Sequence, residues 1–442
     1  MKYFLTTIFL LISCQLVFAW EFATKGVDPV GLHPHLSGGL AVVGDEIVFG
    51  SIGHESNRAM YVVHKDKNGK WHRYHVDSVD PACCDGHEIP SVWYNPHDQH
   101  YYMMYGSITA GRSATPECNN FRGPSPFFRK SINPNDPSKW GPREKLPLCG
   151  GLSEHMGFYT SDGVLHVMGQ HQWTSIGGIH PRYEGFGFDY VRRLPNGKWE
   201  VSQLVDDGRD SGKGGPCNMD FKVYKDKLYV VWGDSTNGCA GTGRNYYSAI
   251  SEDGGNTWWN WAKTKSFKRN KQTVGILGRN SNYEYDEAFA VYKGSTYYDA
   301  EISPSGILYK GGSKIRFARW NGTEWSHVDV GPTSAPNGLA MVQFGNNLVA
   351  HAAAAWGGDL LKYESKDGGK TWKTTTAVKR NNGITGSLRS PISTYSNGTV
   401  HTVVAHGKSP TGDIVYFSEK YSEPVVESEP QLNKIRLRIR IN

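Results

Sequence analysis

The phrase Ser251-Glu-Asp-Gly-Gly-Asn-Thr-Trp258 returns, with two changes, as Ser365-Lys-Asp-Gly-Gly-Lys-Thr-Trp372. Both copies fit a tight hairpin, because the Asp carboxylate can accept hydrogen bonds from the N–H groups of the turn and glycines adopt positive φ at low cost. The tryptophan that ends each phrase suits the apolar core of a sheet. We therefore interpret four residues as structural and not as an active site: Asp253, Trp258, Asp367 and Trp372.

Looser copies of the same turn, each a polar turn followed by a tryptophan, occur elsewhere in the chain. They end at Trp71, Trp140, Trp199 and Trp325, so that the marked tryptophans recur at intervals of 47 to 69 residues. A period of this size is typical of a radial array of four-stranded blades. Chance recurrence of Asn-Gly and Trp would explain one or two copies, but not six at this spacing.

A seventh blade would lack the tryptophan. Strand-like runs at Leu388, 400–405 and 414–417 follow the last marked turn, and we expect a strand from the N-terminal region to close this blade. Other alternating runs, such as 227–232, are bounded by glycine-rich turns, and no long amphipathic helix pattern competes. The sequence thus predicts an all-β fold, a seven-bladed β-propeller of four-stranded antiparallel blades, with residues 20–421 as a single domain.

The two ends of the chain differ from this pattern. Residues 1–19 have the basic start, apolar stretch and small-residue cleavage site of a signal peptide, so we expect a secreted, extracellular protein that begins near Trp20. Polar residues interrupt the apolar stretch and no second one follows, which argues against a membrane anchor. Residues 422–442 join an acidic linker to an alternating basic run, and we favour a mobile tail over an extra strand.

Cysteine usage also indicates an oxidising route. Cys14 is lost with the signal peptide, which leaves Cys83, Cys84, Cys118, Cys149, Cys217 and Cys239. An even number predicts up to three disulfides, and the best single pairing is Cys217 with Cys239. Cys83 and Cys84 more readily bridge to different partners, such as Cys118 and Cys149, than to each other. A zinc site is the alternative, although no Cys-x-x-Cys spacing is present.

Two sequons, Asn321-Gly-Thr323 and Asn397-Gly-Thr399, lie in expected turns and would accept N-glycans in a eukaryotic source.

The net charge gives little indication of a partner. The formal charge of +6 falls to +5 without Lys2, and the tail at 434–441 supplies four of the remaining positive charges. The propeller itself is nearly neutral, so nucleic-acid binding is not indicated and an acidic ligand would need a local cluster of cations. We expect a monomer with no nucleic-acid or membrane partner.

Polar residues interrupt the strand pattern where three successive blades open. The openings are Asp85-Gly-His87-Glu-Ile-Pro90, Ser153-Glu-His155 and Gly215-Pro-Cys-Asn218. Since equivalent positions of neighbouring blades converge on one axis, we expect His87, His155 and Asn218 to face a common cavity, with His171, Arg244 and Tyr246 on or near its rim. For any one of these residues taken alone, a hydrogen-bonded turn histidine or an exposed arginine is the alternative.

The order of these features resembles the Asp-box, or BNR-repeat, propellers that include the ulvan lyases and, more distantly, the sialidases. The resemblance rests on Asp-x-His-x-x-Pro at 85–90, Gly215-Pro216, the run 245–258 and the run 284–291. In that family a histidine corresponding to His87 lines the cleft, so the resemblance supports His87 best.

The chain also departs from that family. It has Ser107 where a second histidine is common, His155 where some members have a tyrosine, and Gln170 or His171 where an arginine is expected. An acid/base pair has therefore been rebuilt if it is present.

The resemblance implies β-elimination of a uronic-acid polysaccharide, so that the expected partner is an acidic polysaccharide or oligosaccharide. Such an enzyme neutralises the uronate carboxylate, removes the C5 proton and protonates the leaving glycosidic oxygen. We assign His155 as base or acid and His87 as its partner or as the carboxylate neutraliser. Substrate-binding roles fall to Arg244, Asn218 and His171, and stacking roles to Tyr246 and Trp173. The mechanism requires no metal or cofactor.

Two rival functions remain at this stage. A non-catalytic carbohydrate-binding propeller is the stronger, because the family's acid/base residues are only partly matched. A sialidase-like glycoside hydrolase ranks lower, because the first blade shows Gly31-Leu-His-Pro-His-Leu36 in place of an Arg-Ile-Pro phrase.

Overall fold

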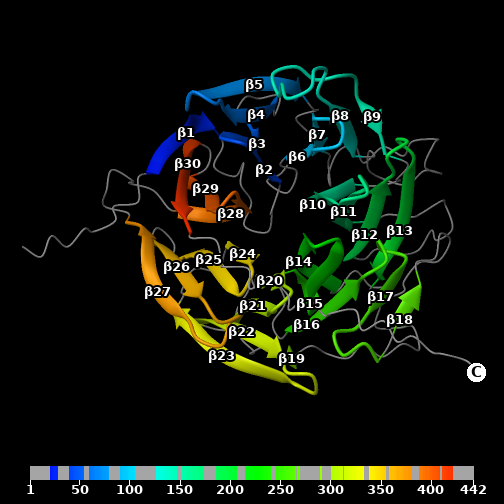
Figure 1. Ribbon diagram of the computed structural model, residues 1–442, viewed down its shortest axis with the longest axis vertical. Helices are drawn as coiled ribbons and strands as arrows, with labels where there is room; N and C mark the ends of the chain where they lie inside the picture. Colours follow the sequence, from blue (N-terminus) through cyan, green and yellow to red (C-terminus); the bar gives the residue numbers. More distant parts are fainter. Residues whose placement is uncertain are drawn as a thin grey trace, which may run out of the picture.

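Seven antiparallel sheets surround one axis, and each sheet is a blade (Figure 1). The computed structural model describes residues 20–27, 39–53, 59–78, 90–105, 126–146, 151–172, 186–206, 215–239, 244–264, 266–268, 289–290, 300–311, 313–332, 338–354, 358–379, 388–408 and 411–421. Every regular element in these ranges is a β-strand. The seven-bladed, all-β prediction is confirmed.

The first three blades each have four strands, paired in chain order from the axis outward. Blade 1 contains β2 (Leu40–Val43), β3 (Glu46–Ile52), β4 (Ala59–Lys65) and β5 (Trp71–Ser78). Blade 2 contains β6 (Ser91–Asn95), β7 (His100–Tyr105), β8 (Phe127–Lys130) and β9 (Glu144–Lys145). Blade 3 contains β10 (Gly151–Tyr159), β11 (Leu165–Gln172), β12 (Phe186–Arg193) and β13 (Trp199–Asp206).

Blade 4 is larger than expected. It contains β14 (Gly215–Tyr224), β15 (Lys227–Cys239), β16 (Arg244–Ser251) and β17 (Thr257–Trp259), followed by β18 (Ser266–Lys268) and β19 (Phe289–Ala290). Strand β17 is short and pairs with β16 only at Ile250. The start of β16 can therefore pair with β19, at Asn245 and Tyr246.

The last three blades return to four strands. Blade 5 contains β20 (Ala300–Ser303), β21 (Gly306–Gly311), β22 (Lys314–Trp320) and β23 (Trp325–Pro332). Blade 6 contains β24 (Leu339–Phe344), β25 (Asn347–Ala353), β26 (Leu360–Ser365) and β27 (Lys373–Val378). Blade 7 contains β28 (Leu388–Ser396), β29 (Thr399–Lys408), β30 (Thr411–Lys420) and, from the N-terminal region, β1 (Trp20–Val27). The expected N-terminal closing strand is therefore confirmed.

The marked tryptophans all stand where the fourth strand of a blade begins. Trp71, Trp199 and Trp325 are the first residues of β5, β13 and β23, Trp258 lies in β17, and Trp140 and Trp372 precede β9 and β27. The turn before each tryptophan joins the third and fourth strands, at the outside of the blade (Figure 1).

The carboxylate of each repeated phrase holds its own turn together, as expected. Asp367 Oδ1 accepts hydrogen bonds from the backbone N–H groups of Lys370 and Thr371, at 3.0 and 2.9 Å, and from the Ser365 hydroxyl at 2.8 Å. Asp253 Oδ1 accepts equivalent bonds from Thr257 and Ser251. All these partners lie within four residues of the carboxylate, so the turn forms from its own sequence.

The second glycine of the turn is needed for space as well as for conformation. Gly255 has φ of 80°, and a Cβ there would lie 2.1 Å from the hydroxyl oxygen of Tyr190 in blade 3. Trp258 is fully buried and meets Tyr190 edge to face, with ring centroids 5.4 Å apart. The turn of blade 4 is thus packed on the neighbouring blade.

The core lies between blades. One cluster combines Met168 and Phe188 of blade 3 with Phe221 and Val230 of blade 4. Because both faces of an inner strand press on a neighbour, β3 and β21 are buried almost throughout and do not alternate with polar residues. The position of a polar side chain on an inner strand is therefore set by the next blade.

Candidate functional site at the entrance end

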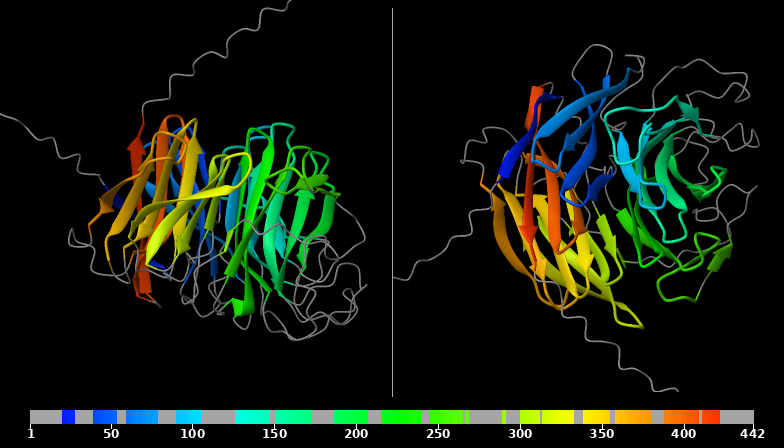
Figure 2. Two further views of the ribbon diagram at one scale, coloured as in Figure 1. Left: turned by 90° about the horizontal axis from the view of Figure 1, so that it is seen from below. Right: turned by 45° about the horizontal axis from the view of Figure 1, so that its top comes forward.

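The blades have a common polarity, which defines two ends of the propeller. The end at which the first and third strands of each blade begin is called the entrance end. The opposite end, at which the first strands terminate, is called the exit end. In the side view of Figure 2 the strands run from one end to the other across the thickness of the disc. Strand register alone places those predicted site residues that the structure describes.

Three of the predicted site residues lie at the entrance end. Arg244 is the first residue of β16 and pairs with Ser235, Asn218 is the fourth residue of β14, and His171 is near the end of β11, opposite Leu152. These strands belong to neighbouring blades 3 and 4. The backbone thus brings the three positions to one end of adjacent blades, and the structure does not describe their side chains. His87 and Trp173 lie outside the described residues.

His155 does not fit its predicted role as a base or acid. It is fully buried between blades 2 and 3, with Nδ1 3.3 Å from the Ser91 hydroxyl, which donates to the His155 carbonyl oxygen at 2.7 Å. Burial lowers the pKa of His155 to about 3, so the ring is neutral near pH 7. A side chain enclosed in this way touches no substrate, and the assignment is corrected to a structural one.

The stacking role predicted for Tyr246 is also wrong. Its ring is fully buried between blades 4 and 5, where its centroid lies 5.7 Å from that of Tyr309. It therefore offers no face to a bound sugar. The alternation of β16 explains the error, because residues 246, 248 and 250 share a face and the neighbouring blade covers that face.

The Cys217 and Cys239 pairing stays a prediction. Cys217 opposes Gly233 in the β14–β15 register, six positions before Cys239 on β15, and the side chains of both cysteines are outside the description. The other four cysteines, the signal peptide and the tail at 422–442 lie outside the described residues.

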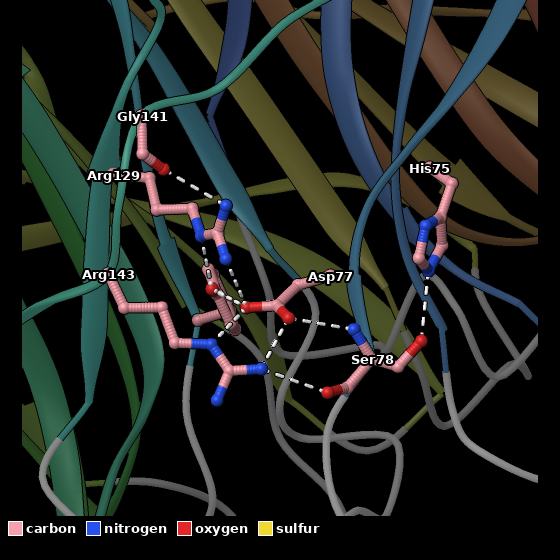
Figure 3. Close-up of polar contacts among 7 residues, drawn as sticks. His75, Asp77, Ser78, Arg129, Gly141 and Arg143 are labelled. Carbon is pink, nitrogen blue, oxygen red and sulfur yellow. Dashed lines mark hydrogen bonds and ion pairs between the residues drawn. The ribbon is translucent and has the colours of Figure 1, made fainter.

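A charged cluster that sequence analysis missed lies at the entrance end, between blades 1 and 2. Asp77, at the end of β5, accepts hydrogen bonds from Arg129 Nη2 at 3.0 Å, from Arg143 and from the Tyr105 hydroxyl (Figure 3). Arg143 also donates to the Ser78 carbonyl oxygen at 3.0 Å. We call these residues the Asp77 cluster.

The Asp77 cluster carries one positive charge in excess. Burial alone would raise the pKa of Asp77, but hydrogen bonds from Arg143 and Tyr105 and the nearby Arg129 charge outweigh it, so the pKa lies below its ordinary value. One ionised carboxylate then faces two guanidinium groups. Asp77 is 8% exposed and Arg143 is 38% exposed, so the surplus charge is on the solvent side. The cluster favours an anion at this end.

No local sequence signal could have found the Asp77 cluster. Its members come from residues 77, 105, 129 and 143, which only the packing of two blades brings together.

A cavity of about 760 Å³ lies on the axis at the opposite, exit end. All seven blades line it, through residues that include Val43, Tyr94, Tyr159, Tyr224, Pro304, Gln343 and Tyr395. Lys222, which also lines it, has Nζ 3.2 Å from Asp220 Oδ1 and 3.1 Å from Glu301 Oε2. We call Asp220, Lys222 and Glu301 the Lys222 network.

The Lys222 network joins blades 4, 5 and 6. Asp220 Oδ2 accepts from the backbone N–H of Ile302 at 2.8 Å, and Glu301 Oε2 accepts from that of Met341 at 3.1 Å. Burial and the neighbouring Asp220 charge raise the pKa of Glu301 to about 8. With two carboxylates around one lysine, the network is neutral or negative. The exit-end cavity is therefore a poor place for an acidic sugar.

Among the described residues, no group of three or more His, Cys, Asp or Glu side chains is arranged to hold a metal ion. The described part of the chain has no helix with the length and apolar character that crossing a membrane requires.

The comparisons with known proteins are limited to structure, since no protein-family model and no curated protein match the chain. The fold is similar to that of an ulvan lyase of polysaccharide lyase family PL25, with a TM-score of 0.65, 15% identity, and coverage of 90% of this chain and 96% of that chain. The same figures hold for this ulvan lyase bound to -[GlcA(1-4)Rha3S]-. Polysaccharide lyase Uly1 is similar with a TM-score of 0.58, 11% identity, and coverage of 88% and 90%. These TM-scores show a shared fold.

Proposed function

We propose that this protein is a secreted carbohydrate-active propeller that cleaves a uronic-acid-containing polysaccharide by β-elimination. The observation that carries the proposal is the fold shared over 90% of the chain with an ulvan lyase, a structure of which holds a glucuronate-containing oligosaccharide. The Asp-x-His-x-x-Pro phrase at 85–90 adds the sequence support.

The charge distribution supports binding at the entrance end. The Asp77 cluster there has a surplus positive charge, whereas the Lys222 network at the exit end is neutral or negative. The Asp77 cluster attracts uronate carboxylates, whereas the Lys222 network repels them or gives them no electrostatic attraction. Arg244, Asn218 and His171 lie at the same end as the Asp77 cluster.

The elimination requires removal of the C5 proton, protonation of the leaving glycosidic oxygen and a positive group near the uronate carboxylate. With His155 enclosed in the core, we assign the proton-handling role to His87 and neutralisation of the carboxylate to Arg244. Asn218 and His171 bind the sugar, and Trp173 offers a stacking surface.

The test is a screen of the purified protein against ulvan, glucuronan, heparin and hyaluronan, following absorbance from the unsaturated uronate product. His87→Ala is expected to lower turnover by roughly two to four orders of magnitude, the usual contribution of a general acid or base. Arg244→Ala should chiefly raise KM, because its cation would contact the uronate before and during reaction.

His155→Gln is the matched control. Because that ring is buried and neutral, the variant should keep turnover within about tenfold of the wild type after correction for folded protein. A loss as large as that of His87→Ala would contradict our placement of the chemistry.

A non-catalytic carbohydrate-binding propeller is the second candidate, and the burial of His155 favours it, because one of the two predicted proton-handling residues is removed. In that case a uronate polymer binds, no unsaturated product forms at any pH, and the His87 change alters affinity alone.

A further inference from the structure

Three tryptophans gather on the outer face between blades 4 and 5. Trp325 starts β23, Trp320 ends β22 directly opposite it, and Trp261 follows β17. Ring centroids are 5.7 Å apart between Trp320 and Trp325, and 5.1 Å apart between Trp261 and Trp325. All three are only partly buried. Large aromatic rings left in contact with water as a group mark a binding surface more often than isolated exposed ones do.

The propeller architecture does not require this group. In blades 1 and 3 the residue opposite the marked tryptophan is a cation: Lys65 lies 5.7 Å from the centroid of Trp71, and Arg193 lies 6.0 Å from that of Trp199. Blade 5 has Trp320 at this position. Trp261 stands in the turn between β17 and β18, and β18 has no counterpart in the described residues of blades 1 and 3. Trp320 and Trp261 are therefore additions to the common pattern.

Polar and cationic groups continue from the tryptophans along blade 5. His327 and Asp329 follow Trp325 on the same face of β23, where Asp329 opposes Arg316. Asp329 Oδ1 is 3.1 Å from Arg316 Nε, and Asp329 Oδ2 is 2.5 Å from Lys314 Nζ. Two cations share one carboxylate, so a positive charge is in surplus. From Trp325 to Asp329 the strand spans about 13 Å, which is room for a short oligosaccharide.

We propose that Trp261, Trp320, Trp325, His327 and Arg316, which we call the blade 5 patch, bind a stretch of an acidic polysaccharide. The apolar C–H faces of pyranose rings would stack on the indoles, which offer a large area for such contacts. Carboxylate or sulfate groups of the same chain would lie beside Arg316 and Lys314.

The tryptophans of the blade 5 patch lie away from the entrance end, whereas Arg316, the third residue of β22, lies toward it. Trp320 and Trp325 flank the turn between the third and fourth strands of blade 5, and such turns are at the exit end. The patch would tether a polymer while another part of it occupies the entrance end. The acidic nature of the ligand rests on the proposed function, whereas the existence of a stacking surface does not.

The experiment is affinity electrophoresis of the full mature chain in native gels containing glucuronan or heparin, with dextran as the neutral polymer. The protein is produced without N-glycans, so that nothing attached at Asn321, next to Trp320, covers the patch. The wild type should be retarded by the two acidic polymers and not by dextran. Trp320→Ala and Trp261→Ala should each raise the apparent Kd roughly tenfold, in the range usual for a buried aromatic contact at an interface.

Trp320→Phe keeps an aromatic face and should retain most of the affinity. Trp199→Phe is the matched control, because Trp199 is the equivalent of Trp325 in blade 3 and has a cation, not a second tryptophan, opposite it. It should leave the apparent Kd unchanged. Arg316→Ala should reduce the preference for glucuronan over dextran. Thermal unfolding of each variant checks that the fold is intact.

Wild-type affinity in both Trp320→Ala and Trp261→Ala would overturn the blade 5 patch, and equal retardation by dextran would overturn its preference for acidic chains. These results are distinguishable from failure of the proposed function. A protein that forms no unsaturated product but loses affinity with Trp320→Ala lacks the lyase activity and keeps the patch. One that forms product and binds normally without Trp320 keeps the activity and lacks the patch.

Discussion

The Asp77 cluster and the Lys222 network are opposites in composition. Each holds three charged side chains between neighbouring blades, but the first places two cations around one carboxylate and the second places two carboxylates around one cation. The first is at the entrance end and keeps Arg143 partly exposed, whereas the second lies in the wall of the exit-end cavity. Contacts of the same kind between blades can therefore give the two ends of the propeller opposite charge.

The strongest test of the comparison is to remove the central lysine. Lys222→Met would leave Asp220 and Glu301 close together in a buried wall, and removing one partner of a buried ion network costs roughly 3–5 kcal/mol of unfolding free energy. Guanidinium unfolding at pH 7 measures the loss. Adding Asp220→Asn should recover a large part of it, because Glu301, whose pKa is about 8, is mostly protonated at pH 7, and Asp220 is the carboxylate left without its cation. An unchanged unfolding midpoint in the single variant would contradict the role given to Lys222.

A smaller loss is expected when the central carboxylate of the other cluster is removed. Asp77→Asn leaves two guanidinium groups facing a neutral amide, but solvent reaches Arg143, so we expect about 2 kcal/mol. Asp367→Asn is the comparison variant, since its partners lie within its own turn, and about 1 kcal/mol is expected there. Urea unfolding of both variants ranks them. A larger loss for Asp367→Asn would show that the local turn matters more than the contact between blades.

The smallest expected effect is the contribution of the buried His155 to the pH dependence of the unfolding free energy. The folded-state pKa of His155 is about 3, below its unfolded value of about 6.5, so between these values the unfolded state binds more protons. Stability from this residue is therefore complete above about pH 6.5 and is lost as pH falls, by up to about 1.4 kcal/mol per pH unit. His155→Gln should flatten the measured dependence between pH 4 and 6 by that amount. A parallel dependence in the variant would mean that His155 is not enclosed as described.

The candidate site at the entrance end was only partly predictable from sequence. Once the blades are counted, the order and direction of their strands follow. Arg244, Asn218 and His171 can then be assigned to one end of the propeller. The burial of His155 and Tyr246 could not be seen in the same way, because a polar residue at a blade opening looks alike whether it faces the axis or the next blade. Arg129 and Arg143 carried no signal at all, since each is separated from Asp77 by a strand or more of unrelated sequence.

The sequence by itself determined the number of blades, the place of each third-to-fourth-strand turn and the need for a closing N-terminal strand. It could do so because the Asp253 and Asp367 turns are made from hydrogen bonds within four residues, and because the tryptophans repeat them at a regular interval. Only the tertiary structure decided which charges meet between blades, which histidine is enclosed and which tryptophans remain in contact with water. Those outcomes depend on the packing of side chains from distant positions in the chain. The free energy of each contact is set by the burial and the identity of the partner side chain, and a local stretch of sequence determines neither.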